Sequence, residues 1–257
     1  MSGFVEPCLA TLRDSPPAGA NWIHEIKYDG YRVQAHRDGK DVTLFTRRGH
    51  DWTNRFGDLA RHIARLSTNQ AIFDGEVIAA DVSGKPDFGL LQDALATGGA
   101  KGLLYYIFDL LYLDGFDLRS TPQLQRKKLL RELLPDAGDG PLLYSEHMET
   151  SGESMFKNAC AMDLEGIVSK RSNAPYASNR GENWIKVKCQ KRGHYPIVAF
   201  VEKLGAKPRR IASFYIGRWE SGKLLYAGKV QSGFTGEQMR ELREVLDPHI
   251  RAIPHLM

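Results

Sequence analysis

The residues best suited to do chemistry lie between positions 22 and 32, in the stretch Trp-Ile-His-Glu-Ile-Lys-Tyr-Asp-Gly-Tyr-Arg. If this segment is a strand, alternation places Glu25, Lys27 and Asp29 on one face, with Lys27 between two carboxylates. Such an ammonium is either a satisfied surface charge or, if desolvated beside other cations, an amine neutral enough to attack an electrophile. The triplet Lys-x-Asp-Gly arises by chance in about one chain in twenty of this length. The choice therefore depends on the rest of the sequence.

Two further predicted strands carry paired charges. Residues 71–79 predict a strand in which Asp74 and Glu76 share a face. Residues 184–188 predict another, in which Lys186 and Lys188 share a face. The sequence therefore brings two carboxylates to one face of the first strand and two cations to one face of the second.

Turn residues and periodicity predict the elements that position these side chains. The apolar run from Leu103 to Leu113 is interrupted only by Asp109, which indicates a strand covered on both sides and a buried charge that needs a partner. Further strands are predicted for 22–28, 31–36, 42–46 and 165–170, and helices for 56–66, 88–95, 124–134 and 153–161. Gly98-Gly99 is expected to end the second of these helices.

The pattern changes after residue 190. Short strands are predicted near 196–203, 211–219 and 223–230, followed by a helix from about 235 to 246. We therefore predict an α+β protein with one domain over 1–190, built of antiparallel sheets with flanking helices, and a second over 191–257.

Composition limits the possible partners and the cellular compartment of the protein. The 35 Lys and Arg against 31 Asp and Glu give a formal charge of +4, too mild to establish a nucleic-acid partner. Cys8, Cys160 and Cys189 are scattered and odd in number, which predicts a reducing compartment, no structural zinc, and Cys160 and Cys189 as ordinary core residues. No secretory signal and no apolar run near ~20 residues is present, so a soluble, cytoplasmic protein without a membrane partner is expected.

Five segments, in order, resemble the motifs of the covalent nucleotidyltransferases, which include ATP-dependent DNA ligases, RNA ligases and mRNA capping enzymes. They are Lys27-Tyr-Asp-Gly-Tyr-Arg32, Phe73-Asp-Gly-Glu76, Tyr106-Ile-Phe-Asp109, Glu165-Gly-Ile-Val-Ser-Lys170 and Trp184-Ile-Lys-Val-Lys188. The flanking text, including Thr46-Arg-Arg-Gly-His-Asp-Trp52 and Gln231-Ser-Gly-Phe234, is most similar to the ligase domain of bacterial ligase D. The resemblance covers the chain from about Glu6 to Pro248 and implies an OB-like second domain.

The resemblance implies a role for each motif residue at the reacting phosphate. Lys27 would be the nucleophile that attacks the α-phosphate of ATP, which requires its pKa to fall from about 10.4. Glu165 and Glu76 would bind Mg²⁺ or Mn²⁺, with Glu76 also near the ribose. Lys186 and Lys188 would neutralise phosphate charge, although a solvated strand face stays open for both.

Other residues match the family's nucleotide contacts. Glu25 corresponds to the residue beside the adenine edge, and Phe108 to the aromatic that stacks on adenine, although plain core packing stays open for Phe108. Arg32 and Arg47 match contacts to ribose and phosphates. Weaker candidates, each equally compatible with a surface charge, are Arg48, Lys170 and Arg180, and His24 is predicted to be structural.

By this resemblance the protein is an ATP-dependent DNA ligase that seals 5′-phosphate/3′-hydroxyl breaks through a lysyl-AMP intermediate, in DNA repair and end joining. Its expected partners are nicked or broken double-stranded DNA, with a Ku-type end-binding protein left open, and its expected location is the cytoplasm at the bacterial nucleoid. An RNA ligase or capping-type enzyme, and a non-catalytic DNA-binding relative, are the alternatives.

One family feature is missing from the sequence. Ligases of this family carry a further basic motif of the type Arg-x-Asp-Lys in the second domain, which orients the pyrophosphate leaving group. No such motif follows Gln231-Ser-Gly-Phe234, and about three strands are predicted where an OB-fold needs five. We therefore expect an OB-like domain lacking its C-terminal strands, and slow attack of Lys27 on ATP.

Overall fold

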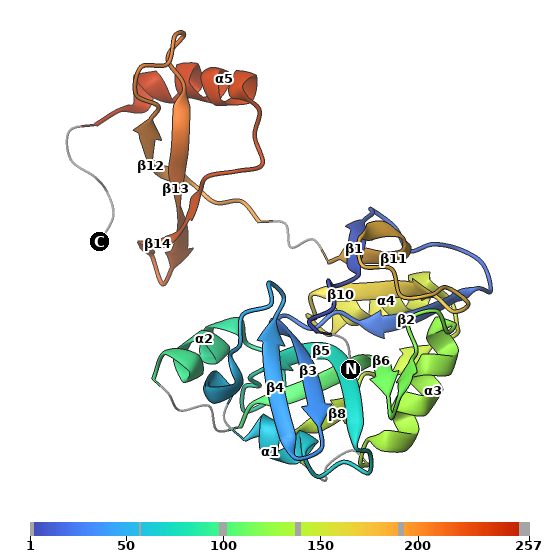
Figure 1. The fold of residues 1–257 in the computed structure, drawn as a ribbon. Coiled ribbons are helices and arrows are strands. Elements are labelled where there is room, and N and C mark those ends of the chain that lie inside the picture. Colours follow the sequence, from blue (N-terminus) through green and yellow to red (C-terminus); the bar gives the residue numbers. More distant parts are fainter. Residues whose placement is uncertain (1–2, 57, 98–101, 137–139, 190–192, 252–257) are drawn as a thin grey trace. The chain divides into compact units, whose positions relative to one another are not determined.

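The structure is a computed structural model that describes residues 3–56, 58–97, 102–136, 140–189 and 193–251. The chain divides into two compact units, Met1–Gln190 and Lys191–Met257 (Figure 1). The predicted α+β class is confirmed, since antiparallel sheets dominate and helices are few. The residue pair at the predicted boundary, 190 and 191, and the predicted helix end at Gly98-Gly99 lie outside the described residues.

The larger sheet of the first unit has the order β4-β3-β5-β6-β7, and β8 pairs in parallel with β6. Its strands are β3 (Tyr31–Asp38), β4 (Asp41–Thr46), β5 (Gln70–Ile78), β6 (Leu104–Leu113), β7 (Phe116–Asp117) and β8 (Leu142–Tyr144). Arg32 and Gln34 on β3 lie opposite Glu76 and Asp74 on β5, so these four side chains share one face of the sheet.

The second sheet of this unit has the order β1-β11-β10-β2-β9. Its strands are β1 (Leu9–Leu12), β2 (Trp22–Ile26), β9 (His147–Met148), β10 (Gly166–Arg171) and β11 (Arg180–Lys188). Because β10 runs antiparallel to both β2 and β11, its first residue lies beside the last residues of those two strands.

Three apolar clusters hold the unit together. Helices α1 (Leu59–Ile63), α2 (Phe88–Ala96) and α3 (Gln123–Leu133) cover the larger sheet with Ile63, Leu91 and Leu130, and Phe56, which precedes α1, joins the same cluster. A second cluster, with Leu111, Tyr176 and Trp184, packs β6 and β5 against β11. The third places α4 (Gly152–Ala161) on the smaller sheet through Ala159 and Ile167.

The prediction that 103–113 is a strand covered on both sides is confirmed. Leu110 is buried in the cluster under the helices, and Leu111 in the cluster next to β11. Asp109 has the partner it requires, since Arg126 on α3 donates to its Oδ1 and Oδ2 at 2.7 and 2.9 Å, with both side chains fully buried.

Within residues 193–251, the second unit has a three-stranded antiparallel sheet in the order β12-β13-β14, with one α-helix and a short 3₁₀ turn. The strands are β12 (Ile197–Glu202), β13 (Ile211–Glu220) and β14 (Lys223–Val230), and the helix is α5 (Gly236–Leu246), capped by Thr235. Ile211, Phe214 and Met239 form its core. The three strands and the helix predicted here are confirmed, and residues 193–251 contain no closed barrel.

The helix predicted for 56–66 is shorter than expected. A 3₁₀ turn, Thr53–Arg55, precedes α1, which covers only Leu59–Ile63. Thr53 is not free to cap a longer helix, because its hydroxyl accepts a hydrogen bond from the Leu44 amide on β4 at 2.9 Å.

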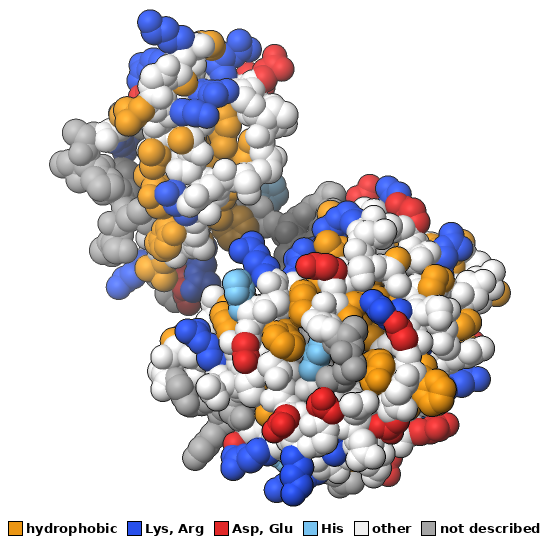
Figure 2. Space-filling view, viewed as in Figure 1, with side chains coloured by type: hydrophobic (Ala, Val, Ile, Leu, Met, Phe, Trp, Pro, Cys, Tyr) orange, Lys and Arg blue, Asp and Glu red, His pale blue; other side chains and the backbone are white. Residues whose placement is uncertain are grey.

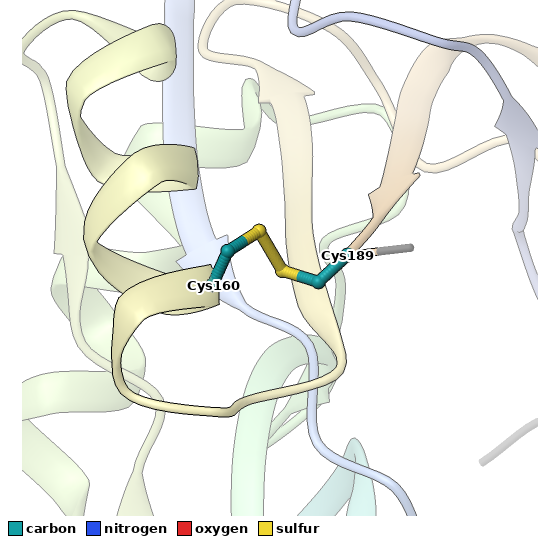
Figure 3. Close-up of a disulfide and its surroundings, with 2 residues drawn as sticks. All are labelled: Cys160 and Cys189. Atoms are coloured by element: carbon teal, nitrogen blue, oxygen red, sulfur yellow. A yellow bond between two sulfur atoms is a disulfide. The ribbon is translucent and has the colours of Figure 1, made fainter. Parts of the chain in front are cut away.

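The prediction for two cysteines was wrong. Cys160, the penultimate residue of α4, and Cys189, the residue after β11, form a disulfide with Cα atoms 5.4 Å apart (Figure 3). Both are half-buried, so they are not core residues. The odd count misled the prediction: Cys8 stays a buried free thiol while the other two pair.

Candidate functional site

A cavity of about 990 Å³ opens in the first unit. Its lining includes most of the side chains singled out from the sequence, namely Glu25, Lys27, Arg32, Arg47, Glu76, Phe108 and Lys186, and the weaker candidates Arg48, Lys170 and Arg180. Glu165 and Lys188 are not part of its lining. They are connected to the cavity through Lys27, which lines it and pairs with Glu165; Lys188 pairs with the same carboxylate.

Lys27, Glu165 and Lys188 meet because three strand ends meet. Lys27 follows β2, Glu165 precedes β10 and Lys188 ends β11. The Lys27 amide donates to the Gly166 carbonyl at 2.9 Å, and the Cys189 amide donates to the Glu165 carbonyl at 2.9 Å. Lys27 Nζ donates to Glu165 Oε2, and Lys188 Nζ lies 2.8 Å from Glu165 Oε1.

Gly166 allows this convergence. Its φ is +146°, and a Cβ there would lie 2.0 Å from the Val187 carbonyl oxygen of the neighbouring strand. Only glycine fits so close to a backbone atom in that conformation. The glycine after Glu165 therefore sets how near β10 and β11 run at the site.

The expected partners of Lys27 were partly wrong. Asp29 is exposed, and Glu25 forms its ion pairs with Lys127 and Lys170 instead. Strand β2 ends at Ile26, so the alternation assumed for residues 27–29 does not apply. The carboxylate at Lys27 comes from Glu165, 138 residues further along the chain.

Burial and neighbouring charge perturb the groups around Lys27. Burial raises the pKa of Glu76 to about 7, against the opposing influence of Lys27 and Arg32. Burial would also raise the pKa of Glu165, but hydrogen bonds from Lys188 and Lys27 outweigh it and hold that pKa below its usual range. Burial, with Lys27 and Lys188 nearby, lowers the pKa of Lys186.

Arg32 is held rigidly against the sheet. Its guanidinium donates to both oxygens of Asp74, at 2.9 and 2.6 Å, and to the Cys8 carbonyl. Tyr176 donates to the same carboxylate at 2.7 Å. Arg47, in contrast, is exposed at the rim of the cavity.

One end of the cavity is aromatic. Phe108 on β6 and Trp184 on β11 meet edge to face with ring centroids 5.7 Å apart, and both line the cavity. Phe108 is only partly buried, so one part packs in the core between the sheets while another part faces the cavity. A planar ligand ring has an aromatic partner here.

Glu25 is the centre of a buried ionic cluster that sequence reasoning largely missed. Lys127 on α3 and Lys170 on β10 each lie 2.9 Å from one of its carboxylate oxygens. Lys170 was a weaker candidate, equally compatible with a surface charge, and Lys127 was not considered. The available signal was a run of three consecutive cations, Arg126-Lys127-Lys128, on the same helix as the core residue Leu130, because three successive helical positions cannot all face solvent.

Few side chains around the cavity could bind a metal ion. No group of three or more His, Cys, Asp and Glu side chains comes together among the described residues. Glu76 and Glu165 interact electrostatically with each other and with Lys27, so two carboxylates face the same region. This fits Mg²⁺, which commonly takes one or two carboxylates and completes its shell with water and substrate phosphates.

The arrangement combines a primary amine, two further lysines, two carboxylates and an aromatic wall. An amine can attack phosphorus, cations can stabilise charge on phosphate oxygens, and an aromatic ring can hold a base. These are the requirements for transfer of a nucleotide to a lysine.

Comparison with known proteins points to one family. Residues 9–188 match the family model described as ATP dependent DNA ligase domain, and residues 207–256 match ATP dependent DNA ligase C terminal region. The multifunctional non-homologous end joining protein LigD of Pseudomonas aeruginosa is 38% identical over 251 residues, which is 96% of this chain and 30% of that protein. DNA ligase 2 of Methanosarcina acetivorans is 30% identical over 256 residues, which is 92% of this chain and 44% of that protein.

A solved structure shares the fold. Mycobacterial DNA ligase D complexed with ATP and MES has a TM-score of 0.65 at 28% identity, covering 98% of this chain and 80% of that one. The chain thus spans less than half the length of the two curated relatives, 30% and 44%. No helix within the described residues has both the length and the apolar character needed to cross a membrane.

Proposed function

We propose that this chain, which belongs to the ATP-dependent DNA ligase family, seals breaks in double-stranded DNA by carrying AMP on Lys27. The observation that supports this most is the convergence of Lys27, Glu165 and Lys188 beside a cavity large enough for a nucleotide.

In the first step the Lys27 amine attacks the α-phosphorus of ATP. The Lys27 ammonium first gives one proton to solvent, so that the neutral amine can attack. The new N–P bond then forms as the bond to the bridging oxygen breaks, pyrophosphate leaves, and a second proton passes from nitrogen to solvent. Lys27 donates to Glu165 in the free protein, so this hydrogen bond has to open before the nitrogen lone pair faces phosphorus. Lys186 and Lys188 would then stabilise the charge on the phosphate oxygens.

The remaining cavity residues would bind the nucleotide. Phe108 offers a ring face to adenine and Glu25 a carboxylate to the base edge. Arg32 and Arg47 would contact the ribose and phosphates, Arg47 from the exposed rim. Mg²⁺ or Mn²⁺, held by Glu165 and Glu76, would supply charge neutralisation at the phosphates.

The later steps need DNA. The adenylate would pass from Lys27 to the 5′-phosphate of the break, and the 3′-hydroxyl would then attack that phosphate and release AMP. The second unit carries basic and hydrophobic side chains on its surface (Figure 2). Among its aromatic residues, Trp219 and Tyr226 are exposed, and Lys229 lies 5.4 Å above the Tyr215 ring. Cations with aromatic rings suit a nucleic-acid backbone and bases.

End joining is the finer proposal. The Pseudomonas aeruginosa relative is a non-homologous end joining protein, and its identity to this chain, 38%, exceeds that of DNA ligase 2, 30%. We propose the same pathway here, at the bacterial nucleoid and with a Ku-type end-binding protein as partner. An RNA ligase or capping-type enzyme would share the lysyl-nucleotide chemistry but not this relationship.

Labelled nucleotide and a denaturing gel test the proposal. Wild-type protein with labelled ATP and Mg²⁺ should become covalently labelled, and Lys27→Ala and Lys27→Arg should not, because alanine has no amine and a guanidinium stays protonated. Lys203→Ala, outside the site, is the matched control. Label on another lysine would disprove the nucleophile, and labelling by GTP in preference to ATP would favour a capping-type enzyme. A nick-sealing assay with and without ATP then tests the later steps.

A further inference from the structure

Three charged side chains lie buried together at one end of the cavity. Lys127 Nζ lies 2.9 Å from Glu25 Oε1, and Lys170 Nζ lies 2.9 Å from Glu25 Oε2. The side chain of Lys127 is 0% exposed, and those of Glu25 and Lys170 are each 2% exposed. Ser145 adds a hydrogen bond to Oε2 at 3.0 Å.

The three members do not have equal access to a ligand. Glu25 and Lys170 line the cavity, whereas Lys127 does not. Lys127 is engaged on its other sides, because it donates to the Ser145 carbonyl at 2.7 Å and lies 4.4 Å from the centre of the Tyr144 ring. It can therefore influence a ligand only through Glu25 and Lys170.

Fold stability alone does not account for Lys127. Removing a lysine from water is costly, and apolar side chains of similar volume usually serve a protein interior as well or better. Its neighbour Arg126 is matched by Asp109 within the core, so helix α3 already has a buried ionic anchor. Lys127 is a second buried cation on the same helix, and it lies behind Glu25, which faces the cavity. Its placement therefore points to a role in controlling Glu25.

Lys127 acts on the ionisation of Glu25. Burial on its own would raise the pKa of Glu25, but Lys127 and Lys170 outweigh it and hold that pKa below its usual range. The protonation state matters to a ligand, because an ionised carboxylate only accepts hydrogen bonds whereas a protonated one can donate. Adenine presents an amino donor at C6, and a 6-oxo purine presents an acceptor there.

We propose that Lys127 is a positioning residue for base selection: it holds Glu25 in place as an acceptor, so that the cavity takes a 6-amino purine in preference to a 6-oxo purine. This inference rests on the proposed function, in which Glu25 faces the base of ATP.

Other titratable groups surround Glu25 and bear on its pH dependence. Lys170 comes from β10, Tyr144 from β8, and His147 from β9 opposite Glu25; Tyr28 and Asp109 also interact with members of the cluster. Burial and the neighbouring Lys127 lower the pKa of His147. All of these groups are common to wild type and variants, but loss of Lys127 also removes one cause that lowers the pKa of His147. The Lys127 variants are therefore compared in a His147→Gln background as well, so that only Glu25 can take up a proton near the base.

The test compares binding of ATP with binding of ITP, which has the same sugar and triphosphate but a 6-oxo purine. Dissociation constants are measured by calorimetry in the Lys27→Ala background with Mg²⁺, so that binding stays reversible, at about pH 7.5 and about pH 5.5. The variants are Lys127→Met and Lys127→Gln, of which the second keeps a donor for the Ser145 carbonyl. Lys128→Met, at the adjacent exposed position of α3, is the matched control.

With Lys127 present, ATP should bind at least about ten-fold more tightly than ITP at both pH values. Without the Lys127 charge, Glu25 should take up a proton on acidification, so the preference should fall to about three-fold or less at the lower pH. Lys128→Met should behave like the parent. A purely structural role for Lys127 would weaken both nucleotides equally and leave their ratio unchanged at both pH values.

Several outcomes would overturn the proposal. One is a folded Lys127→Met or Lys127→Gln protein, judged by its melting curve, that keeps the parental ratio at the lower pH. Another is a parent protein that binds both nucleotides equally, or loses its preference on acidification; this result would overturn the proposal even if both variants fail to fold. Failure of the proposed function looks different, because wild-type protein would then form no adenylate on Lys27.

Discussion

The Lys27 ammonium and the Glu165 carboxylate form an ion pair that joins the residue after β2 to the residue before β10. The same carboxylate contacts Lys188 at the end of β11. Glu165 therefore lies between two cations in the free protein, although its proposed task is to hold a metal ion. In the proposed reaction, binding of nucleotide and metal would have to redistribute these contacts before Lys27 reacts.

Replacing Glu165 should slow the chemistry more than it weakens the fold. Glu165→Ala removes a carboxylate that is 20% exposed and paired with Lys27 and Lys188, so some stability is lost, but the steps that move charge onto phosphate oxygens should slow by about a hundred-fold or more. Glu165→Asp should keep part of the activity. Single-turnover rates of Lys27 adenylylation at saturating Mg²⁺ measure the effect.

Glu182→Ala, at an exposed glutamate on β11 paired with Arg13, controls for loss of a surface charge. It should leave the rate unchanged. Wild-type rates in Glu165→Ala at saturating Mg²⁺ would show that the carboxylate has a structural role only.

Glu76 should make folding depend on pH. Its pKa in the folded protein is about 7 against an ordinary value of 4.5, so the folded state binds this proton more tightly than the unfolded state. The stabilising contribution is complete below pH 4.5 and is lost as the pH rises through about 7. Glu76→Gln cannot titrate, so the free energy of unfolding of wild type relative to Glu76→Gln should fall by about 1–3 kcal/mol across this range.

Urea unfolding at a series of pH values, without nucleotide or metal, measures this difference. Glu149→Gln, at an exposed position, should run parallel to wild type. A constant difference between wild type and Glu76→Gln would mean that Glu76 is ionised equally easily in both states.

The sequence predicted most of the fold because the strands carry strong local signals. The apolar run of β6 and the three strands of the second unit were located within a few residues. The helix at 56–66 was overestimated because the prediction weighed the spacing of Phe56, Leu59 and Ile63 but could not see Thr53 bonded to β4. A hydrogen bond to a distant strand leaves no local trace in the sequence.

In the site, too, features with a local sequence signal were predictable and contacts between distant segments were not. Ordered motifs placed Lys27, Glu76, Phe108 and Lys186 on one cavity, since each motif marks a strand or a strand end. Pairings between motifs were not predictable: Glu165 with Lys27, or Lys127 with Glu25, depends on strand order and helix docking. The Cys160–Cys189 disulfide was missed for that reason too, because α4 and the end of β11 become neighbours only through β10.

The disulfide should contribute measurably to stability. Cys160 and Cys189 are 29 residues apart, and closing a loop of that size in the unfolded chain is worth about 3.6 kcal/mol in the chain-entropy account. Cys160→Ser should lower the melting temperature of the oxidised protein by several degrees. Reductant should destabilise wild type to the same level and leave Cys160→Ser unchanged, and no effect of reductant on wild type would mean that the bond does not form.

Gly166 should be among the least replaceable residues of the site. In Gly166→Ala the new Cβ would meet the Val187 carbonyl oxygen at 2.0 Å, at a φ of +146° that L-residues rarely adopt, so β10 and β11 must separate. We expect a loss of at least about 2 kcal/mol in the free energy of unfolding. Glu165 should also be displaced from Lys27, with a fall in adenylylation larger than the loss of folded protein explains.

Gly181→Ala on β11 is the matched control, because its Cβ would meet nothing nearer than Asn179 Oδ1 at 3.4 Å. Urea unfolding and the single-turnover rate of lysyl-AMP formation, both normalised to folded protein, measure the two effects. Equal behaviour of the two variants would show that the spacing between β10 and β11 does not govern the geometry at Lys27.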